Sequence, residues 1–112
     1  MGAREYLGEF EHVVLLALAR IDHNAYGTSI HEEILEATGR DVSIPAVYVT
    51  LKRMERKGLV RAVVGEAPSG GGRATRNYRL LPEGTAALDR SRALLEQLWS
   101  TADTSGSEAS KS

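Results

Sequence analysis

Several kinds of residue and segment are scarce in this chain of 112 residues. It contains no cysteine, which excludes disulfides, thiolate nucleophiles and cysteine-based metal sites. Its longest apolar run, residues 13–19, is far shorter than the roughly 20 residues that cross a bilayer, and no basic and apolar leader precedes it. We therefore expect a cytoplasmic protein that does not span a membrane.

Groups suited to catalysis or metal binding are also few. The histidines, His12, His23 and His31, include no pair at the i, i+4 spacing that would hold a metal on one helix face. Ser69 has no spaced histidine and aspartate to activate it, and residues 70–72 lack the Gly-Lys-Ser/Thr ending of a phosphate-binding loop. No enzyme activity, metal or cofactor is expected.

The composition is that of one folded domain. Hydrophobic residues make up 42% and charged residues 26% of the chain, close to globular averages. A single hydrophobic core organises a chain of this size, so a second catalytic domain is excluded.

The net charge of −1 conceals a strong asymmetry along the chain. Residues 1–39 carry two basic and seven acidic side chains, residues 40–80 carry nine and three, and residues 81–112 carry three and five. A basic middle between acidic ends is typical of a protein that meets phosphate with one element only. The pattern favours a nucleic-acid interface in the middle of the chain.

Apolar residues recur at helical spacing over about residues 9–22 and predict a helix with a wide apolar face. Leu15 and Leu16 lie off that face. We therefore expect this helix to be covered from two sides, by its own core and by a partner chain.

A second helix is predicted over about residues 26–38, ended by Gly39. Its start has two candidate caps. Asn24 could cap it, while Ser29 with Glu32 has capping-box spacing one turn later.

A third helix is predicted to follow a short link, with Ser43 as its cap, Pro45 in its first turn and Gly58 as its end. The residues expected to face inward are Ile44, Val47, Leu51 and Met54, with Tyr48 at their margin. Those expected to face outward are Pro45, Ala46, Val49, Thr50, Lys52, Arg53, Arg56 and Lys57. Two helices joined in this way, the second basic on its outer face, resemble a helix-turn-helix unit.

A hairpin is predicted next, because residues 59–64 and 77–80 are rich in strand-forming types and flank a glycine-rich loop. Arg73 and Arg76 stand at the base of that loop. A helix-turn-helix followed by a basic hairpin is a winged helix.

A last helix is predicted from Pro82 to about Ala102, with an apolar stripe that the small core leaves uncovered. We therefore expect a dimer. The expected fold is mainly α with a small β-hairpin. It comprises a winged helix-turn-helix domain over residues 1–81, a dimerisation helix over residues 82–102 and a disordered tail over residues 103–112.

Three segments carry a family resemblance. They are Ala25-Tyr26-Gly27, residues 47–60 (VYVTLKRMERKGLV) and residues 76–84 (RNYRLLPEG). In this order and spacing they resemble the PadR family of bacterial transcriptional regulators, over about residues 7–99.

The resemblance implies a winged-helix homodimer that represses transcription. It implies that the third helix enters the major groove, that the wing contacts the DNA backbone, and that the first and last helices form the dimer. The single C-terminal helix is similar to that of the short branch of the family. Some members of that branch bind planar aromatic compounds between the subunits.

The chain departs from the family pattern at two places. Leu81 stands where the family usually has threonine, so the last helix lacks a side-chain cap worth about 0.5–2 kcal/mol, and we expect it to fray. The wing tip, residues 68–72, is unusually rich in glycine.

We expect the third helix to bind DNA through phosphate and base contacts. Its cations would displace condensed counterions. At its leading end small residues would approach base edges, with alanine and threonine methyls meeting thymine methyls, while Arg53 pairs with guanine. A solvated charged face is the alternative. The predicted DNA-binding residues are Ser43, Pro45, Ala46, Tyr48, Val49, Thr50, Lys52, Arg53, Arg56, Arg73 and Arg76.

Some roles stay open on sequence alone. Tyr48 could donate its hydroxyl to a phosphate or close the edge of the core with its ring. Arg73 and Arg76 could contact DNA or only keep the loop soluble. Trp99 could stack on a flat effector, although plain packing in the dimer core is favoured. The predicted dimer or effector residues are Leu15, Leu88, Leu95, Leu98 and Trp99.

Two functions are compatible with these features. The first is a dimeric regulator that binds a pseudo-palindromic operator in double-stranded DNA and is released by a small aromatic effector. The second is a winged-helix module whose basic face binds an acidic protein.

Overall fold

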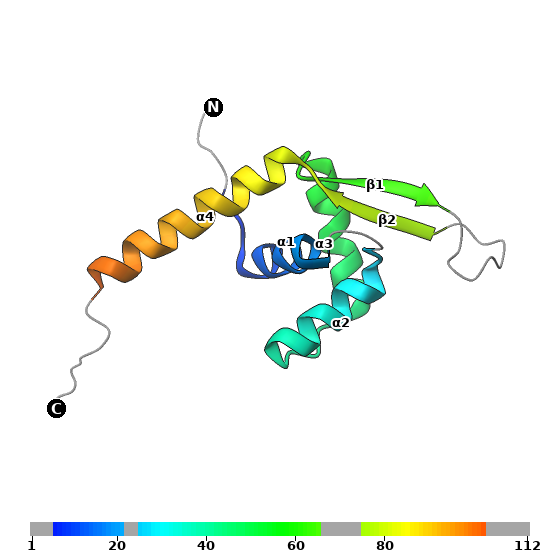
Figure 1. Ribbon diagram of the computed structural model, residues 1–112, viewed down its shortest axis with the longest axis horizontal. Coiled ribbons are helices and arrows are strands. Elements are labelled where there is room, and N and C mark those ends of the chain that lie inside the picture. The colour runs from blue at the N-terminus through cyan, green and yellow to red at the C-terminus, as the bar shows by residue number, and fades with distance from the viewer. Residues whose placement is uncertain (1–5, 22–24, 66–74, 103–112) are drawn as a thin grey trace.

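The computed structural model describes residues 6–21, 25–65 and 75–102. The wing tip with Arg73 and the tail expected to be disordered lie outside these residues. No helix in the described ranges combines the length and apolarity needed to span a membrane. The elements, in chain order, are α1 (Glu9–Ile21), α2 (Gly27–Thr38), α3 (Ile44–Arg56), β1 (Val60–Gly65), β2 (Thr75–Leu80) and α4 (Pro82–Thr101) (Figure 1). The prediction of a mainly helical fold with one small hairpin is confirmed.

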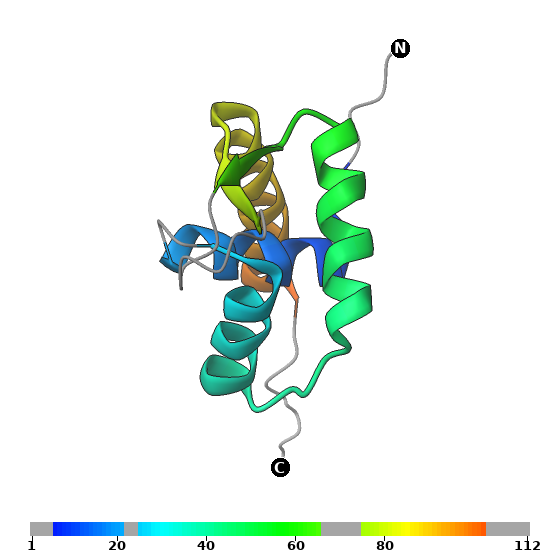
Figure 2. The same ribbon diagram turned by 90° about the vertical axis from the view of Figure 1, so that its right-hand side faces the viewer.

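The first three helices form the body of the protein. In Figure 2, α2 and α3 stand beside each other and are joined by a short loop, while α1 lies across them. The N-cap of α2 is Tyr26, whose backbone N–H donates to the Ser29 Oγ at 2.8 Å. Ser29 therefore lies in the first turn of α2, so the capping box predicted from Ser29 and Glu32 is wrong, and Asn24 lies outside the described residues. The helix ends at Gly39, which adopts a left-handed φ of 78°. The predicted bounds of these helices hold to within a residue or two.

The strands β1 and β2 form an antiparallel ribbon that extends from the body (Figure 1). The inner face of the ribbon carries Tyr78, which is almost fully buried and whose backbone N–H donates to the Ala25 carbonyl at 3.0 Å. This bond ties the ribbon to the start of α2.

The core lies between α1, α2, α3 and the ribbon. Its fully buried large side chains are Tyr78, Leu15, Ile30, Ile34, Leu51, Met54, Val14, Val47 and Val60. Leu15, predicted to contact a partner chain, has no exposed surface, so that prediction is wrong. Because α1 is apolar almost all round, its sequence did not fix which side faces inward. The buried arc includes Leu15, whereas Phe10 and Val13 are only partly buried.

The last helix begins in close contact with the body and then leaves it. The Leu81 N–H donates to the Leu59 carbonyl at 3.0 Å, and a Cβ on Gly84 would lie 2.3 Å from the same oxygen. Leu88 is also buried, with 8% exposure. From residue 92 onward every described residue of α4 is exposed, and Figure 1 shows this half projecting from the body.

Candidate nucleic-acid interface

The outward side of α3 is a narrow strip of four residues. Pro45, Val49, Lys52 and Arg56 follow one another at helical spacing, and all four are exposed. Val49 is 56% exposed, which is high for an aliphatic residue in a helix that packs on a core. We call these four residues the α3 strip.

The α3 strip carries two positively charged side chains and two small apolar ones. Within the described ranges, neither Lys52 nor Arg56 forms an ion pair with an acidic side chain. Exposed cations on a helix can displace counterions from DNA, and apolar groups beside them can meet base edges.

Thr50 does not belong to the exposed side. It was expected to face outward, but it is 3% exposed and lies with the core residues Val47 and Leu51. The buried side of α3 is therefore wider than the apolar pattern indicated, because it includes a threonine beside the apolar residues. Direct contact of this methyl group with thymine, as predicted, does not fit that position.

The leading end of α3 is formed by its cap. Ser43 accepts the Ala46 N–H at 3.1 Å through its Oγ, which confirms the predicted cap. Ser43 and Pro45 are exposed, and Ala46 is partly buried. Their predicted contacts with DNA stay a prediction.

An acidic residue of α1, Glu11, lies against one side of α3. The sequence alone did not single it out. Glu11 is only 8% exposed, and its Oε1 accepts the Gly8 N–H at 2.9 Å. Its Oε2 lies 3.3 Å from Arg53 Nη1 and 3.4 Å from Lys57 Nζ. Two of the four cations predicted on α3 are therefore paired within the chain. We call Glu11, Arg53 and Lys57 the Glu11 cluster.

The Glu11 carboxylate is held in its charged form. Burial alone would raise the pKa of Glu11. The Gly8 hydrogen bond, the charge of Lys57 and the bonds from Arg53 and Lys57 outweigh it, and the pKa lies below its ordinary value of 4.5. The cluster is therefore a charged network at neutral pH.

The ring of Tyr48 covers the start of α2. A Cβ on Gly27 would lie 2.3 Å from Tyr48 Cζ, so any larger residue there would require the ring to move. The ring is 37% exposed. This contact explains the glycine of the Ala25-Tyr26-Gly27 segment and supports the ring-packing role of Tyr48. Whether its hydroxyl also meets a phosphate stays a prediction.

The wing carries three described arginines. Arg76 Nη1 lies 3.9 Å from Glu55 Oε1 of α3, so this ion pair links the ribbon to the helix. Arg61 and Arg79 occupy directly opposite positions in the strand pair, and both are exposed. Like charges placed opposite each other weaken a strand pair, so these two residues do not stabilise the ribbon.

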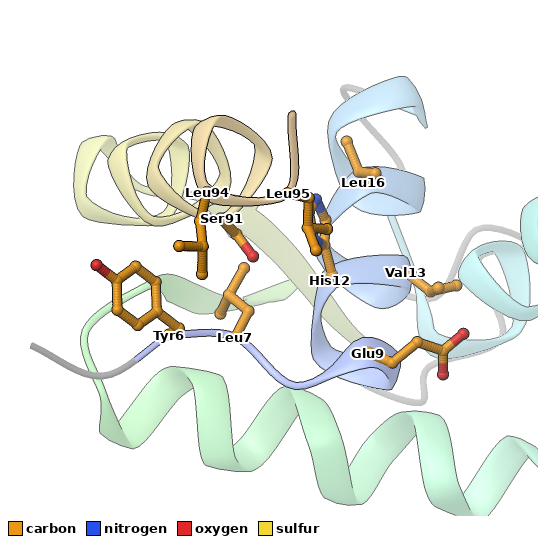
Figure 3. Close-up of a pocket in the computed structure, with 9 residues that line it drawn as sticks. All are labelled: Tyr6, Leu7, Glu9, His12, Val13, Leu16, Ser91, Leu94 and Leu95. Carbon is orange, nitrogen blue, oxygen red and sulfur yellow. The ribbon is translucent and has the colours of Figure 1, made fainter. Parts of the chain in front are cut away.

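An apolar groove runs between α1 and the outer half of α4. Figure 3 shows Leu95 of α4 beside His12 of α1, and Leu94 pointing toward Leu7 and Tyr6. This part of the groove has a volume of about 400 Å³, and a neighbouring part lined by Leu88, Arg92 and Trp99, among others, has about 590 Å³. The large apolar residues left exposed around it are Leu16, Leu94, Leu95, Leu98 and Trp99. Leu88, predicted to contact the partner, is already covered by its own chain.

Comparison with known proteins agrees with this architecture. A sequence model of the transcriptional regulator PadR-like family matches residues 14–90. The chain belongs to the PadR family. It is 40% identical over 77 residues to transcriptional regulator Rv3488 of Mycobacterium tuberculosis, which covers 69% of this chain and 68% of the relative.

Solved PadR-family and other winged-helix structures share the fold. A PadR-family regulator from Clostridium difficile R20291 has a TM-score of 0.69 and 22% identity, with 83% of this chain and 93% of that chain covered. F93 from STIV, described as a winged-helix DNA-binding protein, has a TM-score of 0.66 and 16% identity, with 84% and 95% covered. The protein is thus a regulator of the PadR family with a winged-helix fold, and the family is one of transcriptional regulators.

Proposed function

We propose that this regulator is a homodimeric repressor that binds a pseudo-palindromic operator in double-stranded DNA. The observation that carries the proposal is the α3 strip, in which two exposed small residues are followed by two cations without a described acidic partner. In a dimer, two such helices about one turn of DNA apart, roughly 34 Å, would enter successive major grooves.

The dimer in this proposal is supported by α4. Its 20 residues make a helix about 30 Å long, and the apolar side of its outer half has no cover within the described chain. Trp99 is 66% exposed and Leu98 is 57% exposed. Exposed apolar surface of this kind marks an interface, and a second copy presents a matching surface.

An aromatic effector is the second element of the proposal. The part of the groove beside Trp99 and Arg92 has room for a small planar compound, and the indole ring offers a surface for stacking. A panel of planar aromatics should change the fluorescence of Trp99, the only tryptophan in the chain. Unchanged fluorescence would count against the effector and leave DNA binding untouched.

DNA binding is tested by the salt dependence of affinity for a duplex of random sequence. Lys52→Gln and Arg56→Gln should each lower the slope of log K against log salt by about 0.9 per subunit, because each removes one phosphate contact. Arg20→Gln on α1 is the matched control, since Arg20 is also exposed but pairs with Glu33 of α2. Equal slopes for Arg56→Gln and Arg20→Gln would contradict the assignment of the α3 strip.

The alternative function is a module that binds an acidic protein. The parent protein distinguishes the two at low salt, because any DNA-binding regulator has measurable affinity for random duplex DNA. If no binding occurs there, the acidic-partner function replaces the proposed one. If binding occurs, sequencing of the bound fragments should give a palindromic site.

A further inference from the structure

The Glu11 cluster joins α1 to α3, and the proposed function does not use this link. Glu11 and Arg53 are 42 residues apart in sequence, and the pair links the first turn of α1 to the second half of α3. The carboxylate is fixed from both sides. One oxygen accepts the Gly8 N–H, and the other faces two cations. The charge is therefore held in place before any ligand arrives.

The helical wheel of α3 separates its cations into two groups. Lys52 and Arg56 lie on the α3 strip, at the centre of the exposed side. Arg53 and Lys57, at i, i+4 spacing, lie on the neighbouring side that meets α1. Their side chains are 45% and 32% exposed, so both remain within reach of solvent while they face Glu11.

We propose that Glu11 is a specificity-determining residue, because it holds Arg53 and Lys57 back from phosphate and leaves nonspecific DNA attraction to the α3 strip. This inference rests on the proposed DNA-binding function. A phosphate competes for these cations with a carboxylate that is fixed and only 8% exposed. Charges screened less by water interact more strongly than exposed ones, so the internal partner has the advantage.

A purely structural role explains the cluster less well. The two cations are 45% and 32% exposed, and ion pairs with such exposed partners contribute little to stability, so the cluster is a weak means of holding two helices together. Limiting nonspecific affinity is useful to a regulator, because specific sites compete with a large excess of other DNA.

The test is the salt dependence of binding to random duplex DNA by the full chain. Glu11→Gln keeps an acceptor for the Gly8 N–H and removes the charge that holds the cations. It should raise affinity several-fold at low salt and steepen the slope by about 1 per subunit for each cation released. The matched control is Glu33→Gln, which removes the same charge and breaks the Arg20–Glu33 pair, neither partner of which is on α3. The control slope should equal that of the parent.

Two further sets of variants make the test independent of how Glu11→Gln folds. In the parent background, Arg53→Gln and Lys57→Gln should leave the random-duplex slope within about 0.3 of its parent value, whereas Arg56→Gln lowers it by about 0.9. In the Glu11→Gln background, adding Arg53→Gln and Lys57→Gln should return the slope to that of the parent.

The possible failures are distinct. If the parent does not bind duplex DNA, the proposed function and this inference both fall. If the parent binds and Glu11→Gln leaves the slope unchanged or lowers it, only the inference is overturned. A loss of slope in Arg53→Gln as large as in Arg56→Gln would also overturn it.

Discussion

Gly27 is in close contact with one side chain, that of Tyr48. Its Cα lies under the ring of Tyr48, a residue from the next helix, and any Cβ there would overlap the ring carbons. The contact orients α3 against the start of α2, so the residue type at one position affects how the α3 strip is presented.

We predict that Gly27→Ala lowers the free energy of unfolding by about 1–3 kcal/mol, because the added methyl group overpacks this site. Urea denaturation at fixed protein concentration measures the loss. Gly8→Ala is the control, since a Cβ there would lie at an ordinary 3.8 Å from Glu11 Oε1. Tyr48→Ala in the Gly27→Ala background should recover part of the stability. Equal losses for Gly8→Ala and Gly27→Ala would contradict the contact.

The lowered pKa of Glu11 makes part of the stability depend on pH. A carboxyl whose pKa is lower in the folded than in the unfolded state stabilises the fold fully above its unfolded value, here about 4.5, and this contribution is lost as pH falls through the folded pKa. We predict that Glu11→Gln costs about 1 kcal/mol at neutral pH, as expected for partly exposed pairs.

The measurement is urea denaturation of both proteins between pH 3 and pH 7. The difference between parent and Glu11→Gln should be constant down to about pH 5.5 and shrink below pH 4.5, because the parent loses the charge that the variant never had. A difference that persists unchanged at pH 3 would show that the charge of Glu11 contributes nothing.

The sequence predicted which cations of α3 are exposed, but it did not predict which of them pair with an acidic residue. Spacing alone placed Lys52 and Arg56 on the outside, since charged residues at helical intervals face water. It could not show that Glu11 pairs with Arg53, because nothing local in the chain relates residues 42 positions apart. Thr50 was misplaced for a related reason, since its burial depends on tertiary packing that helical spacing does not show.

At the scale of elements, local signals fixed the bounds of α3 and α4. Ser43 begins α3 with a side-chain cap, and the left-handed Gly58 follows its end. Pro82 begins α4, but Leu81 at its cap position makes no side-chain hydrogen bond, as the sequence predicted. The backbone partly compensates, since the Leu81 carbonyl accepts the Gly84 N–H at 2.8 Å. The predicted fraying of this end stays untested.

We predict that Leu81→Ser stabilises the protein by about 1 kcal/mol relative to Leu81→Ala, because a serine hydroxyl at the cap position can accept a hydrogen bond from a backbone N–H of the first turn. The two variants lose the same packing of the leucine side chain, so their difference isolates the cap. Thermal and urea denaturation give the values. Equal stability would mean that backbone bonds already satisfy this end of α4.

At the scale of the whole molecule, the outer half of α4 is the part that one chain leaves incomplete. The sequence predicted its apolar stripe, but it assigned Leu15 and Leu88 to the partner, and both are covered within the chain. The error has a physical cause. Helical spacing shows which residues share one side of a helix. The residue at which the helix leaves the core depends on tertiary packing.

We predict that Leu98→Glu dissociates the dimer, because it places a charge in the apolar surface that two copies would bury. Each leucine buried at the interface contributes about 1.5–3 kcal/mol, and a dimer loses two of them, so the dissociation constant should rise at least 100-fold. Light scattering after size exclusion measures the mass. Ser100→Glu adds the same charge on the opposite side of the same helix and should stay dimeric. A parent that is already monomeric would contradict the proposed dimer, and a Leu98→Glu variant that stays dimeric would place the dimer contacts elsewhere than on the outer half of α4.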